Sequence, residues 1–310
     1  MKVTFAFLFT LFIASIGFSQ ECESNILRIS PLVEGTLLTP STNSFNDPIA
    51  IIIPGSGPTD RDGNQPTLNN NSLKLLAQGL CKEGVSTFRY DKRLLAQIRS
   101  KNFDENKVHF DQFVDDAKEV ARFLAKSGYT NISFVGHSQG ALVAQLAATQ
   151  DSIVKKVVLL AGAGKPIDEV VVDQINNTAP GLTENAKNAF KEIRENGSTT
   201  NYNPFLASIF RPSVQPFMNS WMQYDPSAVI AEMKMPILII TGSKDLQVSK
   251  AEGDSLAAKN TSAQRLHIEN MNHVLKEITG DDLENSKSYQ ETYRPVIPQL
   301  IDSVAVFLKE

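Results

Sequence analysis

Residues 131–148 constrain the fold most, because a strand-like run passes into a helix-like run through a very short turn. The turn is Gly136-His137-Ser138-Gln139-Gly140, which fits the pattern G-x-S-x-G. A serine at such a turn crowds the residues two before and two after it, so glycine is needed at both places. The pattern predicts a parallel βα unit that exposes the Ser138 hydroxyl. The alternative is an ordinary turn in which Ser138 caps the helix.

The rest of the chain repeats this alternation of strand and helix. The strand-like runs are 26–29 and 33–38, expected as a hairpin, and then 48–54, 85–90, 156–161, 236–241 and 263–268. The helix-like runs are 72–82, 110–127, 251–259 and 298–309. Unbroken apolar runs such as 48–54 are typical of strands that are buried on both faces. The predicted fold is therefore α/β, with a mostly parallel, doubly wound sheet of the eight-stranded type between helices.

The alternation breaks between residues 163 and 235. This segment holds an amphipathic helix near 184–195 and an aromatic-rich run at 202–224. We interpret it as a helical cap inserted into one domain that spans residues 20–310. The aromatic side chains are expected to form a small core of the cap itself.

The first nineteen residues differ from the rest. Lys2 precedes an apolar run from 3 to 16, and small residues follow up to Ser19. This is typical of a signal peptide cleaved after Ser19, so we expect a secreted or periplasmic protein without stable membrane insertion. An uncleaved anchor is the alternative. Cys22 and Cys81 could pair in an oxidising compartment, although sequence alone does not give their distance.

Charge and composition argue against a nucleic-acid partner, a bound metal and a cofactor. The formal net charge is −4 and no Lys/Arg block occurs, so no nucleic-acid partner is expected. The four histidines lie far apart and the two cysteines form no metal-binding motif, so we expect neither a metal nor a cofactor.

A serine hydroxyl needs a base, and the base needs a group that orients it. Asp245 follows the strand-like run at 236–241, and His273 follows the run at 263–268. Both should lie at the sheet edge that carries Ser138, in the order serine, acid, histidine. Asp225 is the main rival to Asp245, but Asp225-Pro226 has the pattern of a helix start. The remaining histidines fit a catalytic position less well: His109, His137 and His267.

Such a site also needs donors for a developing oxyanion. We expect the backbone N–H groups of Gln139, directly after the serine, and of Ser56 in Gly55-Ser56-Gly57. A plain turn at 55–58 is the alternative.

Together these motifs resemble the α/β-hydrolase superfamily, and most closely secreted bacterial serine hydrolases of the dienelactone-hydrolase and serine-aminopeptidase-like groups. They lie at 54–64, 89–93, 136–140, 242–245 and 272–273. The resemblance implies Ser138 as nucleophile, His273 as base, Asp245 as its orienter, and Ser56 with Gln139 as oxyanion hole. Lipase-type loops often have a histidine before their glycines where this chain has Pro54, so no lipase-like specificity is carried over. Five charged residues recur in the related chains, and substrate contact and a salt-bridge or turn role both stay open for them: Asp60, Arg61, Asp62, Arg89 and Asp91.

The predicted function is that of a serine hydrolase acting on small-molecule esters through an acyl-enzyme, without a cofactor. One alternative is a peptidase or amidase with the same residues and a short peptide substrate. Another is a binding protein on a hydrolase scaffold. Ser138 in place of an aspartate disfavours a dehalogenase. The sequence leaves the oligomeric state open.

Overall fold

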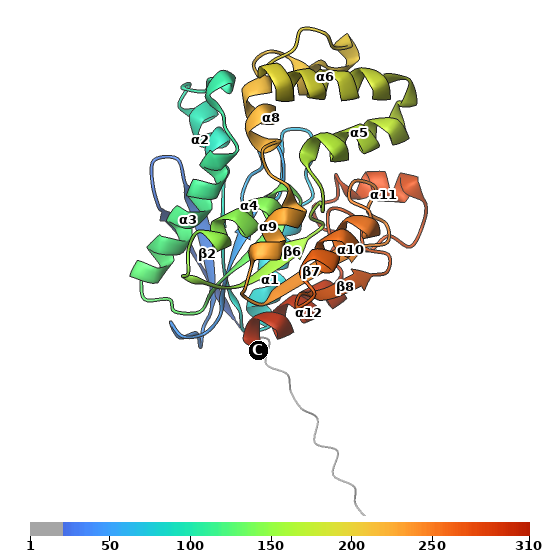
Figure 1. The fold of residues 1–310 in the computed structure, drawn as a ribbon. Coiled ribbons are helices and arrows are strands. Elements are labelled where there is room, and N and C mark those ends of the chain that lie inside the picture. The colour runs from blue at the N-terminus through green and yellow to red at the C-terminus, as the bar shows by residue number, and fades with distance from the viewer. Residues whose placement is uncertain (1–20) are drawn as a thin grey trace, which may run out of the picture.

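The structure, a computed structural model, describes residues 21–310, so the predicted signal peptide 1–19 lies outside the described residues. Within this part of the chain, eight strands form one sheet in the order β1-β2-β4-β3-β5-β6-β7-β8 (Figure 1). They are β1 Cys22–Arg28, β2 Glu34–Pro40, β3 Ile49–Ile53, β4 Ser86–Tyr90, β5 Ile132–His137, β6 Val154–Leu160, β7 Ile237–Gly242 and β8 Gln264–Ile268. The pairs β1/β2 and β2/β4 are antiparallel and every other neighbouring pair is parallel. The predicted mostly parallel, eight-stranded sheet is confirmed.

Helices cover both faces of the sheet (Figure 1). The predicted helices are present as α1 Ser72–Lys82, α3 Asp111–Lys126, α4 Gln139–Thr149, α6 Thr183–Asn196, α10 Lys250–Lys259 and α12 Pro298–Lys309. The helices that we did not predict are α2 Arg93–Arg99, α5 Ile167–Thr178, α7 Ala207–Phe210, α8 Gln215–Trp221 and α11 Asp282–Ser288. A short helix, α9 Pro226–Glu232, begins at the expected Asp225-Pro226 start.

Strand β3 shows why its apolar run is unbroken. Ile49, Ile51 and Ile53 belong to the core that the sheet shares with α3 and α4. Ala50 and Ile52 belong to the core on the opposite face, with α1 and α12. Successive residues of a strand point to opposite faces, so in β3 both sets of side chains are buried in an apolar core.

The segment between β6 and β7 carries α5 to α9. Figure 1 shows α5, α6 and α8 gathered at one end of the molecule, away from α12. Side chains from α5 to α8 form a separate small core that includes Phe190 and Phe210. Helix α9 instead packs against α4 and α10. The residues 163–235 thus contain this small core, and their limits as a cap stay a prediction.

The cap aromatics do not all pack within the cap. Phe210 is fully buried there, but Trp221 stacks on Phe110, with ring centroids 5.4 Å apart. Phe217 meets Phe113 of α3 edge to face at 5.9 Å, and Phe205 is 87% exposed. Aromatic contacts therefore also tie α8 to the region of α3.

The two cysteines are joined. A disulfide between Cys22 and Cys81 links β1 to the end of α1, as the sequence allowed. Among residues 21–310 no helix combines the length and the apolar character that a membrane crossing requires.

Candidate active site

Ser138 occupies a strained turn between β5 and α4. Its backbone has φ 53° and ψ −119°, and its side chain forms no capping hydrogen bond to α4. A Cβ on Gly136 would lie 2.2 Å from the Gly140 carbonyl oxygen, and one on Gly140 would lie 2.3 Å from the Ile53 carbonyl oxygen. Both positions therefore require glycine, for the reason that the spacing predicted. The geometry favours an exposed nucleophile over a helix cap, because strain of this kind collects at functional sites.

Asp245 and His273 follow the carboxyl ends of β7 and β8 and form a hydrogen-bonded pair. His273 Nδ1 lies 2.8 Å from Asp245 Oδ2. The other carboxylate oxygen accepts the N–H groups of Gln247 at 2.8 Å and Val248 at 2.9 Å. Burial would raise the pKa of Asp245, but the charge and hydrogen bond of His273 and these two N–H groups hold it below its usual range. The carboxylate is thus ionised and points His273 in one direction.

Ser138 and His273 line the same small cavity, of about 100 Å³. Among the described residues the structure contains no hydrogen bond between the Ser138 hydroxyl and the His273 ring. Such contacts are often long without substrate and tighten when it binds. The fold therefore brings Ser138, Asp245 and His273 together, and two of them, Asp245 and His273, are in direct contact.

His137 is a site residue whose role we missed. Its Nε2 lies 2.7 Å from the His273 carbonyl oxygen, and the two rings are 5.0 Å apart. A carbonyl oxygen only accepts, so His137 Nε2 carries the proton. Burial lowers the pKa of His137 to about 4, with a further contribution from His273. A neutral His137 therefore holds the backbone of the loop that carries His273. In the sequence, the one sign of this role of His137 was its position beside Ser138 in the motif.

The loop after β3 packs directly against the nucleophile. A Cβ on Gly55 would lie 3.3 Å from both Ser138 Cβ and His137 Nδ1. The Ser56 carbonyl accepts hydrogen bonds from Thr59 Oγ1 and Gln65 Nε2, each at 2.7 Å. Among residues 21–310 the Ser56 N–H has no acceptor, and the Gln139 N–H lies in the first turn of α4, where helical partners are lacking. Both N–H groups are therefore available to a ligand.

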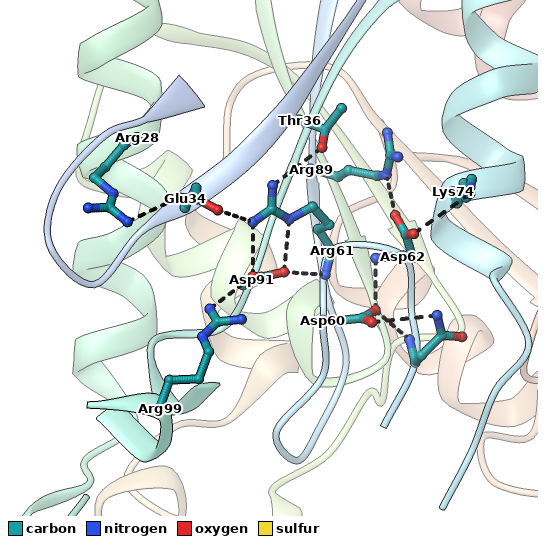
Figure 2. Close-up of polar contacts among 11 residues, drawn as sticks. Arg28, Glu34, Thr36, Asp60, Arg61, Asp62, Lys74, Arg89, Asp91 and Arg99 are labelled. Carbon is teal, nitrogen blue, oxygen red and sulfur yellow. Dashed lines mark hydrogen bonds and ion pairs between the residues drawn. The ribbon is translucent and has the colours of Figure 1, made fainter. Parts of the chain in front are cut away.

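Charged residues anchor this loop (Figure 2). The Arg61 guanidinium binds both oxygens of Asp91 at 3.0 Å, and its backbone N–H donates to Asp91 Oδ1 at 2.9 Å. Arg61 also reaches Glu34 at 2.8 Å, and Arg89 binds Asp62 at 3.1 Å. Burial would raise the pKa of Asp91, but Arg61 outweighs it and the pKa lies below its usual range.

Turn contacts complete the anchor. Asp60 Oδ1 accepts the N–H groups of Asp62 at 2.9 Å and Asn64 at 2.8 Å. None of the five recurring charged residues lines a cavity that contains Ser138. The contacts of these five residues are thus those of a salt-bridge or turn role and not of substrate contact.

A larger cavity, of about 340 Å³, lies on the other side of Ser138. Its wall is mainly apolar and comes from α4, α5 and the region of α7 to α8, with Leu142, Val170, Ile209, Phe217 and Trp221 among its residues. Lys165 is the charged residue of this wall, and it pairs with Asp173 and Glu252. Among the described residues neither this cavity nor the smaller one has an Asp or Glu in its wall.

Comparison with known proteins identifies the family and the fold. Residues 70–278 match the family model described as serine aminopeptidase, S33. Esterase EstD of Thermotoga maritima is 24% identical over 265 residues, which cover 83% of this chain and 61% of that protein. This chain thus spans about three fifths of the length of that relative.

Solved structures share the fold at low identity. Est1E from Butyrivibrio proteoclasticus has a TM-score of 0.59 and 16% identity, over 92% of this chain and 98% of that one. A dienelactone hydrolase from Anabaena variabilis has a TM-score of 0.50 and 14% identity, over 87% and 96%. The family match covers most of the chain, and the sheet, helices and structural neighbours agree with it. The chain therefore belongs to the serine aminopeptidase S33 family and has the α/β-hydrolase fold.

Proposed function

We propose that this protein is a serine hydrolase that cleaves carboxylic esters. Ser138 is the nucleophile, His273 the general base and Asp245 the group that orients it. The backbone N–H groups of Ser56 and Gln139 form the oxyanion hole. The name of the relative EstD, an esterase, agrees with this proposal.

The contacts of His273 support its proposed role as the base. Its Nδ1–H donates to Asp245, so Nε2 is left as the base. This nitrogen takes the Ser138 proton while the hydroxyl oxygen attacks the ester carbonyl carbon. The negative oxygen of the tetrahedral intermediate is stabilised by the two N–H groups and by the positive end of α4.

The proton held by His273 is then transferred to the leaving group. When the intermediate collapses, the carbon–oxygen bond to the alcohol breaks, and His273 returns the proton to the alkoxide. A water molecule repeats the sequence on the acyl-enzyme, with His273 as base, and releases the acid and the free serine.

One observation favours an ester over an aminopeptidase substrate: the walls of both cavities beside Ser138 lack a carboxylate among the described residues. An aminopeptidase has to hold a free ammonium group at its substrate's end, and a buried ammonium needs an opposite charge. The charged side chain in the wall of the larger cavity is Lys165, and the two carboxylates that it binds, Asp173 and Glu252, are not free to hold an ammonium group. We therefore expect hydrolysis of esters and not of aminoacyl anilides.

Labelling with a fluorophosphonate probe tests the nucleophile. We expect labelling of the purified protein and none of Ser138→Ala, with a loss of roughly 10⁶ in kcat for p-nitrophenyl esters. Ser303→Ala is the matched control, because Ser303 lies on α12 and lines neither cavity. Equal labelling of Ser138→Ala would refute the mechanism, and no labelling of folded protein would favour the binding-protein alternative. Faster turnover of aminoacyl anilides than of esters would favour the peptidase.

We also propose that the protein is exported and cleaved after Ser19. The Cys22–Cys81 disulfide supports this, since such bonds persist in oxidising compartments. Mass spectrometry of the extracellular and periplasmic fractions should find a mature chain that begins at Gln20. A chain that retains Met1 and stays in the cytoplasm would contradict the proposal.

A further inference from the structure

A third cavity, of about 370 Å³, adjoins the 340 Å³ cavity that contains Ser138. The two share the wall residues Gln139, Ser208, Val214 and Phe217. The third cavity is otherwise bounded by the loop after β3, by α2, by the segment between α2 and α3, and by α3; Figure 1 shows where these elements lie. The residue that follows the nucleophile therefore separates the two cavities.

Lys92 lines this cavity and forms no ion pair with any carboxylate among residues 21–310. Its side chain is 3% exposed, its Nζ donates to Gln139 Oε1, and it lies 4.4 Å from the centroid of the Phe113 ring. Among residues 21–310 no carboxylate lies within 4.0 Å of this ammonium group, and the nearby Asp116 forms its ion pair with Arg93, at 2.6 Å and 2.8 Å. One of the three N–H donors of the ammonium binds Gln139 Oε1 and the face of the Phe113 ring attracts its charge, so within the described residues the other two donors have no oxygen acceptor.

Gln139 adds a further unpaired donor. Its side-chain nitrogen is buried and has no hydrogen-bond partner in the described structure, while its oxygen is bound by Lys92. Rotating the amide would place its NH₂ group against the ammonium, so Lys92 determines the orientation. Buried polar groups are normally paired, and this cluster offers donors only.

The other charged groups of this cavity do not satisfy Lys92. Glu105 also belongs to the wall, but it is paired with Arg211, with 3.0 Å between Arg211 Nε and a Glu105 carboxylate oxygen. The remainder of the wall is largely apolar: Leu94, Ile98, Phe103, Val108, Phe113, Val214 and Phe217. The cavity thus combines an apolar wall with an unneutralised cation.

We propose that this cavity binds a free carboxylate carried by the ester substrate, with Lys92 as its ion-pair partner and an apolar chain or ring between carboxylate and ester. The inference rests on the proposed function, because it names a substrate class for the same nucleophile. A carboxylate supplies both the acceptors that the cluster lacks and the charge that a buried ammonium requires. Burial lowers the pKa of Lys92 to about 7, against a smaller opposing effect of the Asp116 charge, so a bound carboxylate would raise the protonated share of this lysine near neutral pH.

Two pairs of esters of matched length test the proposal. One pair is monomethyl suberate and methyl octanoate, and the other is acetoxyhexanoate and hexyl acetate. The first pair places the carboxylate on the acyl side of the ester, and the second pair places it on the alcohol side. In at least one pair we expect a higher kcat/KM for the carboxylate ester than for the neutral ester. The ratio of these two kcat/KM values should fall by about tenfold or more in Lys92→Met. A ratio within one protein cancels any general loss of activity.

Lys165→Met is the matched control, because it removes the cation of the neighbouring cavity. A ratio that falls with Lys165→Met and not with Lys92→Met would overturn the proposal. So would a wild-type protein that prefers the neutral ester in both pairs.

A binding experiment keeps the proposal testable apart from catalysis and from folding of the variant. Calorimetric titration of the intact protein with hexanoate should show proton uptake near neutral pH and weaker binding at about pH 9 than at about pH 6, since only the charged lysine attracts the anion. Hexanol is the neutral comparison. Equal binding of hexanoate at both pH values would refute the site. If fluorophosphonate does not label Ser138 but hexanoate binds as expected, the proposed function fails and the site stands.

Discussion

The burial of His137 makes a quantitative prediction about acid stability. Its pKa is about 4 in the folded protein, against 6.5 as its ordinary value. Between these values the unfolded chain binds a proton that the folded chain does not, so the free energy of unfolding falls as the pH falls. One pKa unit corresponds to about 1.4 kcal/mol, and the full contribution of His137 is thus a loss of about 3 kcal/mol between about pH 6.5 and about pH 4.

The substitution His137→Gln isolates this contribution. Glutamine has an N–H group that can reach the His273 carbonyl, but it does not titrate. Urea unfolding, followed by the fluorescence of Trp221, the single tryptophan, would give the free energy of unfolding of both proteins across this pH range. We expect the wild-type protein to lose about 3 kcal/mol more than the variant on acidification. Carboxylates such as Asp245 titrate in both proteins, so their effect cancels in the difference.

The exposed His109 provides the control, because His109→Gln should follow the pH dependence of the wild-type protein. A difference between wild type and His137→Gln that stays constant from about pH 7 to about pH 4 would refute the argument. In that case His137 would be charged in the folded state, or accessible to water.

Three further predictions concern the acid, the loop and the disulfide. Asp245→Asn should lower kcat by about 10⁴, because His273 loses the partner of its Nδ1–H. Asp225→Asn, at the start of α9, should leave kcat near the wild-type value. If ester kinetics showed the larger loss in Asp225→Asn, Asp225 would be the catalytic acid. Arg61→Ala should lower the free energy of unfolding by about 3–5 kcal/mol, since it leaves the buried Asp91 carboxylate without its main partner, and an unchanged urea midpoint would contradict that. Cys22→Ser should lower the free energy of unfolding by up to about 4 kcal/mol relative to the oxidised wild-type protein, by the loop-entropy model, and the reduced wild-type protein should unfold like the variant; a variant as stable as the oxidised protein would contradict this.

Some elements escaped prediction for identifiable reasons. Helix α5 contains Val170, Val171 and Val172 in succession, and β-branched residues have low helix propensity, so only packing within the cap explains its conformation. Helix α2 has seven residues, which is too short for a clear period. The reach of the proposed cap and the signal peptide stay predictions.

The sequence by itself determined the sheet and the place of the candidate site. Gly136 and Gly140 mark the turn through local spacing, and the ends of apolar strands located Asp245 and His273, because parallel strands bring their carboxyl ends to one edge. Only the tertiary structure decided which side chains support that site. His137 acts on a carbonyl 136 residues away, and Lys92 meets Gln139 across 47 residues. Such contacts depend on how separate elements pack and on which buried groups find partners, and no local pattern in the chain records either.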